Sequence, residues 1–146
     1  MFRTGSGLID AEHAFTVARR QSRRAALVRS LRRDGSSSRR LEVFCRVRSG
    51  RSGATGAIRE IPLDAIGGTL EPSRAAQFDA AFRPVAGSAR KRWERIWLAE
   101  DRGAILPPIS VIPVGENQYA VVDGHHRVSV AHARGAVAID ATVAAR

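Results

Sequence analysis

The order of hydrophobic patterns along the chain predicts a small α+β domain that follows a basic helix. Within residues 58–146, short runs rich in β-branched residues are separated by segments of helical periodicity. Apolar alternation is typical of strands, and a period of about 3.6 residues is typical of an amphipathic helix. Residues 1–57 are instead dominated by arginine and small residues. We therefore expect a basic N-terminal helix with a flexible linker over residues 1–57, and a compact domain over residues 58–146.

Composition limits the class of protein. Of the 146 residues, 44% are hydrophobic, which suits one globular domain. No apolar run reaches the roughly 20 residues that span a membrane, and no apolar signal segment is found near the N-terminus. A single cysteine, Cys45, excludes an internal disulfide framework and is typical of a reducing compartment. We expect a cytoplasmic protein without a membrane partner.

The predicted N-terminal helix begins at Asp10, which can act as its cap, and ends at Asp34-Gly35. Its apolar stripe is narrow, and arginine fills most of the remaining surface. The stripe consists of Ala11, Ala14, Phe15, Ala18, Ala25, Val28 and Leu31. The Ser-, Gly- and Arg-rich segment from residue 35 to residue 56 is predicted to be a linker, broken by a marginal strand over residues 41–45.

The net charge of +10 belongs to this N-terminal part. Residues 1–60 contain 14 arginines and 5 acidic residues, whereas residues 61–146 contain 10 basic and 9 acidic residues. An arginine-rich helix could lie on an acidic partner or along a nucleic-acid backbone such as that of DNA, because the guanidinium group suits phosphate. It could also dock its stripe on its own domain or on a second copy of the chain, as in a homodimer. Both alternatives stay open.

The compact domain opens with an alternating run over residues 58–66. Within it, Pro62 indicates an edge strand or a strand that is split by a turn. Gly67-Gly68 is expected to end this strand. A short helix is predicted over residues 75–82.

A stronger helix is predicted over residues 90–102 and ends before Gly103. Trp93 and Trp97 lie one turn apart within it, so both are expected in the core. A hairpin of two strands, a further helix and a last strand follow, connected as a mostly local meander. Their predicted ranges are residues 109–114, 119–122, 125–134 and 138–143.

The turn between the hairpin and its helix carries the candidate site. Gly124 can adopt a positive φ and start the helix. The free N–H groups and the positive end of the helix dipole are then supplemented by His125, His126 and Arg127, which predicts an anion site with phosphate as the candidate ligand. Asp123 precedes the turn.

Residues 58–143 resemble the superfamily of the ParB N-terminal domain and sulfiredoxin. Four motifs carry the resemblance in order: Ile-Pro-Leu-Asp-Ala-Ile, a helix ending in Gly before Pro-Pro-Ile-Ser-Val, Val-Val-Asp-Gly-His-His-Arg-Val-Ser-Val-Ala, and a final Gly followed by Ile-Asp-Ala-Thr-Val. The resemblance implies a nucleotide-binding domain in which the helix after the Asp-Gly-His-His-Arg turn meets the phosphates. The implied cofactor is ATP, ADP or CTP, with or without Mg²⁺.

The turn departs from two branches of this superfamily. Sulfiredoxins have Gly-Cys-His-Arg, whereas His125 replaces the cysteine here, so sulfinic-acid reduction is not expected. Partition ParB proteins have Gly-Glu-Arg-Arg and continue into a helix-turn-helix domain, for which no residues follow Arg146. Asp-Gly-His-His-Arg is closest to the ADP-dependent free serine kinases, which place an acidic catalytic base before the first helix. Glu71 or Asp64 would fill that place here.

These observations give a leading and an alternative hypothesis. The leading one is a nucleotide- or phosphate-binding protein, DNA-associated in a partition or regulatory role. Arg127 and His126 would clamp phosphate oxygens, His125 would lie beside the terminal phosphate, and Arg74 could reach the same site. Asp123 would orient a histidine or hold a metal-bound water, and no protein residue is predicted as a direct metal ligand. The alternative is a small-molecule phosphotransferase with Glu71 and His125 as catalytic residues.

Overall fold

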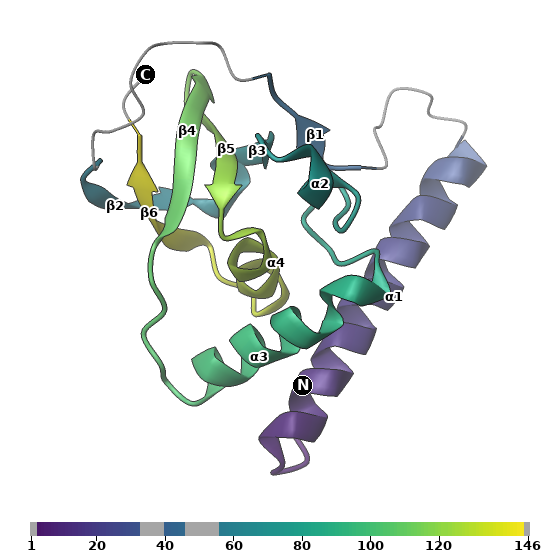
Figure 1. Ribbon diagram of the computed structural model, residues 1–146. Coiled ribbons are helices and arrows are strands. Elements are labelled where there is room, and N and C mark those ends of the chain that lie inside the picture. The colour runs from purple at the N-terminus through teal and green to yellow at the C-terminus, as the bar shows by residue number, and fades with distance from the viewer. Residues whose placement is uncertain (1–2, 33–39, 46–55, 145–146) are drawn as a thin grey trace.

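The computed structural model describes residues 3–32, 40–45 and 56–144 (Figure 1). Its strands form one mixed sheet in the order β1-β3-β5-β4-β6-β2. β1 pairs parallel to β3, β3 to β5, and β4 to β6, while β4 with β5 and β2 with β6 are antiparallel. The strands are β1 Glu42–Val43, β2 Ile58–Pro62, β3 Ile66–Thr69, β4 Ile109–Gly115, β5 Gln118–Asp123 and β6 Ala138–Val143. This arrangement confirms the predicted α+β class.

The prediction of a mostly local meander is wrong. Among the described strands, only β4 and β5 are both consecutive in the chain and paired in the sheet. Parallel pairs such as β3 with β5 need a crossover connection, and the helices between the strands supply it. The α-helices are α1 Gly7–Arg32, α2 Pro72–Ala75, α3 Arg90–Asp101 and α4 His125–Ala133, and 3₁₀ turns cover Leu63–Ala65 and Gly87–Ala89.

The opening strand is split, as Pro62 predicts. β2 ends at Pro62 and lies at one edge of the sheet, and a 3₁₀ turn then leads into β3. Gly67 and Gly68 do not end the strand, contrary to expectation, but lie inside β3. A β-carbon at Gly68 would collide with the carbonyl oxygen of Glu42 and with the Phe44 ring, so the missing side chain allows β1 to approach β3.

The helix predicted over residues 75–82 is also wrong, because α2 occupies Pro72–Ala75 and the next residues form a tight loop. The buried carboxylate of Asp79 accepts the backbone N–H groups of Ala81 and Arg83, each at 2.9 Å. Such a local side-chain bond competes with helix formation. Phe82 adopts a φ of 59° in this loop while its ring is buried.

α4, α3 and α1 are stacked on one side of the sheet (Figure 1). α4 lies next to the sheet, α3 packs on α4, and α1 crosses α3. Trp93 and Trp97 of α3 are 0% and 1% exposed, which confirms that both belong to the core. The Trp93 indole N–H donates to the Ser129 hydroxyl of α4 at 2.9 Å. This hydrogen bond satisfies the polar atom of a fully buried ring and fixes α3 against α4.

The N-terminal helix docks on this core. It begins at Gly7, so Asp10 is not the cap but lies in the first turn, where its carboxylate accepts the backbone N–H and the hydroxyl of Thr4 at 2.9 Å. Phe15 is fully buried and meets Trp93 edge-on, with ring centroids 5.5 Å apart. The predicted end at residues 34–35 and most of the predicted linker lie outside the described residues.

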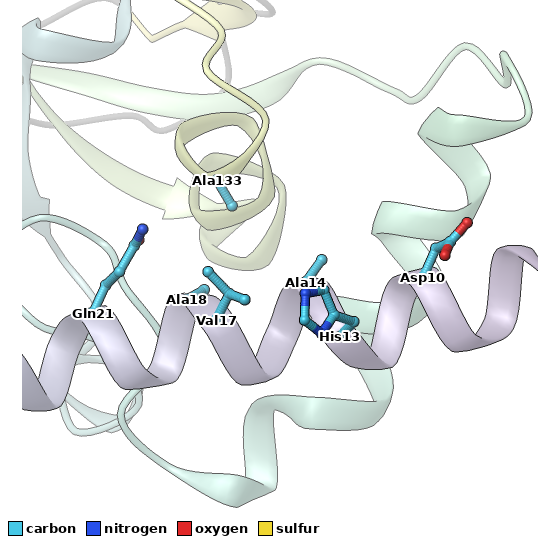
Figure 2. Close-up of a pocket in the computed structure, with 7 residues that line it drawn as sticks. All are labelled: Asp10, His13, Ala14, Val17, Ala18, Gln21 and Ala133. Atoms are coloured by element: carbon cyan, nitrogen blue, oxygen red, sulfur yellow. The ribbon is translucent and has the colours of Figure 1, made fainter. Parts of the chain in front are cut away.

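The apolar stripe of α1 divides into a packed half and an exposed half. Figure 2 shows Val17 and Ala18 of α1 opposite Ala133 of α4, along a cavity of about 210 Å³. Val28 and Leu31, nearer the end of the helix, are 46% and 76% exposed. The first half of α1 therefore packs on its own domain, and this docking was one of the two alternatives for the N-terminal helix. No helix in the described part of the chain is long and apolar enough to cross a bilayer.

Replacement of Phe15 tests whether α1 belongs to the core. Phe15→Ala is expected to lower the free energy of unfolding by about 3–5 kcal/mol, because it empties a fully buried site against Trp93. The matched control is Leu31→Ala on the exposed end of the same helix, which should change stability by about 0.5 kcal/mol or less. Urea denaturation of both variants measures the difference. Equal midpoints would support an independent domain that begins at residue 58.

Candidate functional site

The start of α4 is set by Gly124. This residue follows β5 with a φ of 105°, a left-handed conformation that favours glycine. A β-carbon there would lie 2.5 Å from Cγ2 of Ile109 in β4, so the space is closed as well. The first helical hydrogen bond runs from the Val128 N–H to the Gly124 carbonyl at 3.0 Å. No side chain caps the helix, which leaves the N–H groups of residues 125–127 directed outward at its positive end.

A cavity of about 100 Å³ lies in front of this helix end. Three helices and one strand supply its walls, so residues far apart in the sequence meet there. Arg74 comes from α2 and Arg92 from α3, while the turn itself provides the floor. The lining residues are Arg74, Arg92, Ile96, Asp123, Gly124, His125, His126 and Arg127. The structure thus brings together every predicted binding residue, Arg74 included.

Arg127 is engaged by the protein itself. One terminal nitrogen of its guanidinium group donates to the carbonyl oxygens of Pro107 and Pro108, the latter at 3.0 Å. The other donates to the carboxylate of Asp123 at 3.1 Å. Arg127 therefore ties the segment before β4 to the start of α4. These contacts explain why Arg127 can occupy the first turn of α4, although the helix dipole disfavours a cation there.

His125 is directed into the body of the protein. Its side chain is 3% exposed, and its Nε2 atom contacts the hydroxyl of Thr69 at the end of β3. The same hydroxyl accepts the backbone N–H of Glu71 at 2.8 Å and lies 3.2 Å from the Val121 carbonyl oxygen. His125 thus joins α4 to β3 and to the segment that leads into α2.

His126 has a different environment. It is 5% exposed and its ring forms a T-shaped contact with the Phe78 ring, with centroids 5.2 Å apart and the planes at 82°. Its side chain lines the cavity, and no hydrogen bond joins its ring to any of the described residues. Its ring nitrogens are not among the solvent-excluded, unpartnered side-chain atoms of the described residues, so they are open to the cavity, where water or a ligand can satisfy them.

Both histidines of the turn are neutral at neutral pH. The pKa of His125 is lowered to about 4, chiefly by burial and further by the nearby Arg74 and His126. Asp123 acts in the opposite direction and raises this pKa. Burial, with Arg92 and Arg74, lowers the pKa of His126 to about 4. The positive charge in the cavity therefore comes from arginine rather than from histidine. Because the folded-state pKa values lie below the ordinary 6.5, the protein loses stability as pH falls from about 6.5 towards 4.

The two candidate acidic bases do not enter the cavity. Glu71 is exposed at the start of α2, and only its backbone reaches the site, through Thr69. Asp64 lies near His132, at the other end of α4, where burial lowers the pKa of His132 and the charge of Asp64 partly offsets that effect. Among the described residues, no cluster of three or more His, Cys, Asp or Glu side chains could hold a metal ion.

Sequence reasoning missed Arg92. A signal was available, since the first turn of α3 contains Arg90, Lys91 and Arg92 and no acidic residue. Cations are disfavoured at that end of a helix by its dipole, so such a cluster points to a local role. The distance along the chain between Arg92 and the turn concealed the connection.

The fold and the cavity define a small α+β domain with the open end of a helix facing a basic recess. The chain belongs to the ParB N-terminal domain family, whose pattern matches residues 48–146. This match confirms the resemblance predicted from the four ordered motifs, and it leaves α1 outside the matched region. The crystal structure of sulfiredoxin from Arabidopsis thaliana is similar, with a TM-score of 0.44 and 19% identity over 62% of this chain and 86% of that chain. No curated protein matches.

Two glycine substitutions test how the helix start is fixed. Gly103→Ala, at a φ of 80° in open space, should cost only the penalty for a left-handed residue, about 1–2 kcal/mol. Gly124→Ala should cost distinctly more, because the new methyl group also collides with Ile109. Thermal or urea unfolding of the two variants measures the difference. Equal losses would show that Ile109 gives way and that the position of α4 is not fixed by this contact.

Proposed function

We propose that this ParB-family domain binds a phosphate-containing ligand, a nucleotide, in the cavity in front of α4. The observation that carries the proposal is the convergence of Arg74 and Arg92, from two different helices, on the uncapped N-terminus of a third. Helix N-termini bind phosphate through their free N–H groups and dipole, and guanidinium groups add charge-assisted hydrogen bonds.

The arginines of the cavity differ in their availability. Arg127 already donates to two carbonyl groups and one carboxylate. Arg74 has a long contact of 3.4 Å to the neutral amide of Gln77, and Arg92 is exposed with no ion pair to a described residue. Arg74 and Arg92 therefore supply the charge for a ligand, while Arg127 holds the turn in place.

Binding is favoured over phosphoryl transfer. The alternative hypothesis needs an acidic base within reach of an acceptor, and Glu71 does not line the cavity. His125, its proposed catalytic partner, is directed towards Thr69 and away from solvent. The contacts of both residues support a role in holding the turn.

Alanine substitutions test this assignment. Arg74→Ala and Arg92→Ala should each weaken the binding of ADP, ATP, CTP or pyrophosphate by about 1.5–3 kcal/mol, the range for a hydrogen bond to a charged group. Arg127→Ala should chiefly lower stability, since it releases the Pro107 and Pro108 carbonyl groups. Arg102→Ala, an exposed arginine outside the cavity, is the control. Calorimetry that finds unchanged affinity in folded Arg74 and Arg92 variants would contradict the proposal.

A second candidate function, contact with DNA through α1, is favoured by a separate basic recess. This recess has a volume of about 200 Å³ and lies between α1 and the start of α3. Two of its guanidinium groups are held in place: that of Arg19 donates to the Val85 carbonyl at 3.2 Å, and that of Arg90 lies 4.6 Å from the centroid of the Phe15 ring. The lining residues are Thr16, Arg19, Arg20, Arg23 and Arg90. Preordered arginines suit a phosphate backbone.

Charge reversal tests the DNA hypothesis. Because Arg19 is engaged with Val85, the informative pair is Arg20→Glu with Arg23→Glu, both exposed. This variant should lose DNA binding. For the wild type, the logarithm of the affinity should fall with the logarithm of the salt concentration, with a slope of about −0.9 per neutralised phosphate. The matched control is Arg59→Glu with Arg102→Glu, an equal change of charge on exposed residues in β2 and directly after α3. Equal loss in both double variants, or none in either, would exclude a specific role for α1.

A further inference from the structure

We propose that the cavity takes a terminal phosphate group, a phosphomonoester, and that His126 recognises it by taking up a proton as the ligand binds. The inference rests on the proposed function and deepens it. It specifies which part of a phosphate ligand enters the cavity, and it assigns a role to the His126 ring that lines the cavity.

The size of the cavity selects a small group. At about 100 Å³ it has room for several water molecules. Pockets that enclose a whole drug-sized molecule measure about 300–1,000 Å³. A single phosphate group can therefore enter, while a nucleoside attached to it must lie outside on the surface. An internal phosphate, with substituents on two oxygens, fits less well at the bottom of such a recess.

The charge of the cavity matches a dianion. Three guanidinium groups and one carboxylate line it, and Arg127 and Asp123 neutralise each other at 3.1 Å. The two remaining positive charges are those of Arg74 and Arg92. A phosphomonoester carries nearly two negative charges at pH 7, since its second pKa is about 6, whereas a phosphodiester carries one.

His126 is placed to respond to that charge. Its ring is 5% exposed, forms a T-shaped contact with Phe78, and lines the cavity with nitrogens that have no hydrogen bond to the described residues. A protonated ring nitrogen that is open to the cavity can donate to a phosphate oxygen.

The charged groups around His126 explain why its protonation depends on the ligand. Arg74 of α2 and Arg92 of α3 face it, and together with burial they keep its pKa near 4 in the unliganded protein. Asp123, Arg127 and the neutral His125 complete the set of titratable groups that line the cavity. A bound dianion offsets the two arginine charges and attracts a proton from solvent onto the ring, so the pKa of His126 rises on binding. Affinity should therefore increase as pH falls from 8 towards 7.

The test is calorimetry at pH 7.0 in two buffers of different ionisation enthalpy, which yields the number of protons taken up on binding. The ligands are 5′-AMP and 5′-CMP, each compared with its 3′,5′-cyclic diester. The proteins are the wild type, His126→Asn, which keeps a donor but cannot titrate, and His13→Asn, an exposed histidine of α1, as control. Subtraction of the His126→Asn value from the wild-type value cancels the protons that the ligand itself exchanges.

We expect the wild type and His13→Asn to bind the better monophosphate about tenfold more tightly than its cyclic diester and to take up about half a proton or more. His126→Asn should take up none beyond the ligand's own contribution and should discriminate threefold or less. Equal binding of monoester and diester, or no proton uptake in the wild type, would overturn this inference and leave the proposed function intact. Failure of the wild type to bind these ligands or pyrophosphate would overturn both.

A second measurement keeps the inference testable if His126→Asn does not fold. Nitrogen-15 spectra of the histidine rings in the wild-type protein report the charge of each ring directly. With saturating monophosphate at pH 7.0, one buried ring should change from neutral to cationic. Spectra in which every buried ring stays neutral with bound ligand would refute proton uptake by His126.

Discussion

The left-handed turn at Gly124 fixes where α4 begins, and the candidate site depends on that position. The side chain of Ile109 fills the space that a β-carbon would need, and the Arg127 guanidinium joins the turn to the segment before β4. The free N–H groups of α4 consequently face a cavity rather than a neighbouring element. In the sequence, Arg127 and His125 resemble ligand-binding groups. In the structure, their contacts hold this turn in place. The groups available to a ligand are Arg74, Arg92 and His126.

The position of Arg92 depends in turn on the packing of the helices. Trp93, the next residue of α3, is fully buried, donates to Ser129 of α4 and meets Phe15 of α1 edge-on. These contacts set the rotation of α3 about its axis, and that rotation directs Arg92 towards α4. α1 lies outside the region that matches the ParB N-terminal domain family, yet its Phe15 contributes to the core that supports the site. Its exposed arginines, by contrast, form a surface that the site does not use.

Much of the fold could be predicted from the sequence, because local signals were consistent with it. Pro62, the Trp93 and Trp97 spacing and the Gly124 turn each indicated the element that forms. Strand order could not be predicted, because it depends on crossovers that leave no local signal. The 72–84 region was misassigned because the buried Asp79 carboxylate replaces helical hydrogen bonds. At the site, the lowered pKa values of His125 and His126 could not be predicted, since burial is a property of the folded chain that residue types do not reveal.

The central claim is that Arg74, Arg92 and the N-terminus of α4 bind phosphate while Arg127 stays attached to the protein. A crystal structure of the protein with bound pyrophosphate tests it most directly. A phosphate group is expected within hydrogen-bond distance of Arg74, of Arg92 and of the backbone N–H groups of residues 125–127, beside the His126 ring. Arg127 is expected to keep its contacts with Pro107 and Pro108. Pyrophosphate bound only in the recess between α1 and α3, or bound through an Arg127 released from those carbonyl groups, would contradict the account.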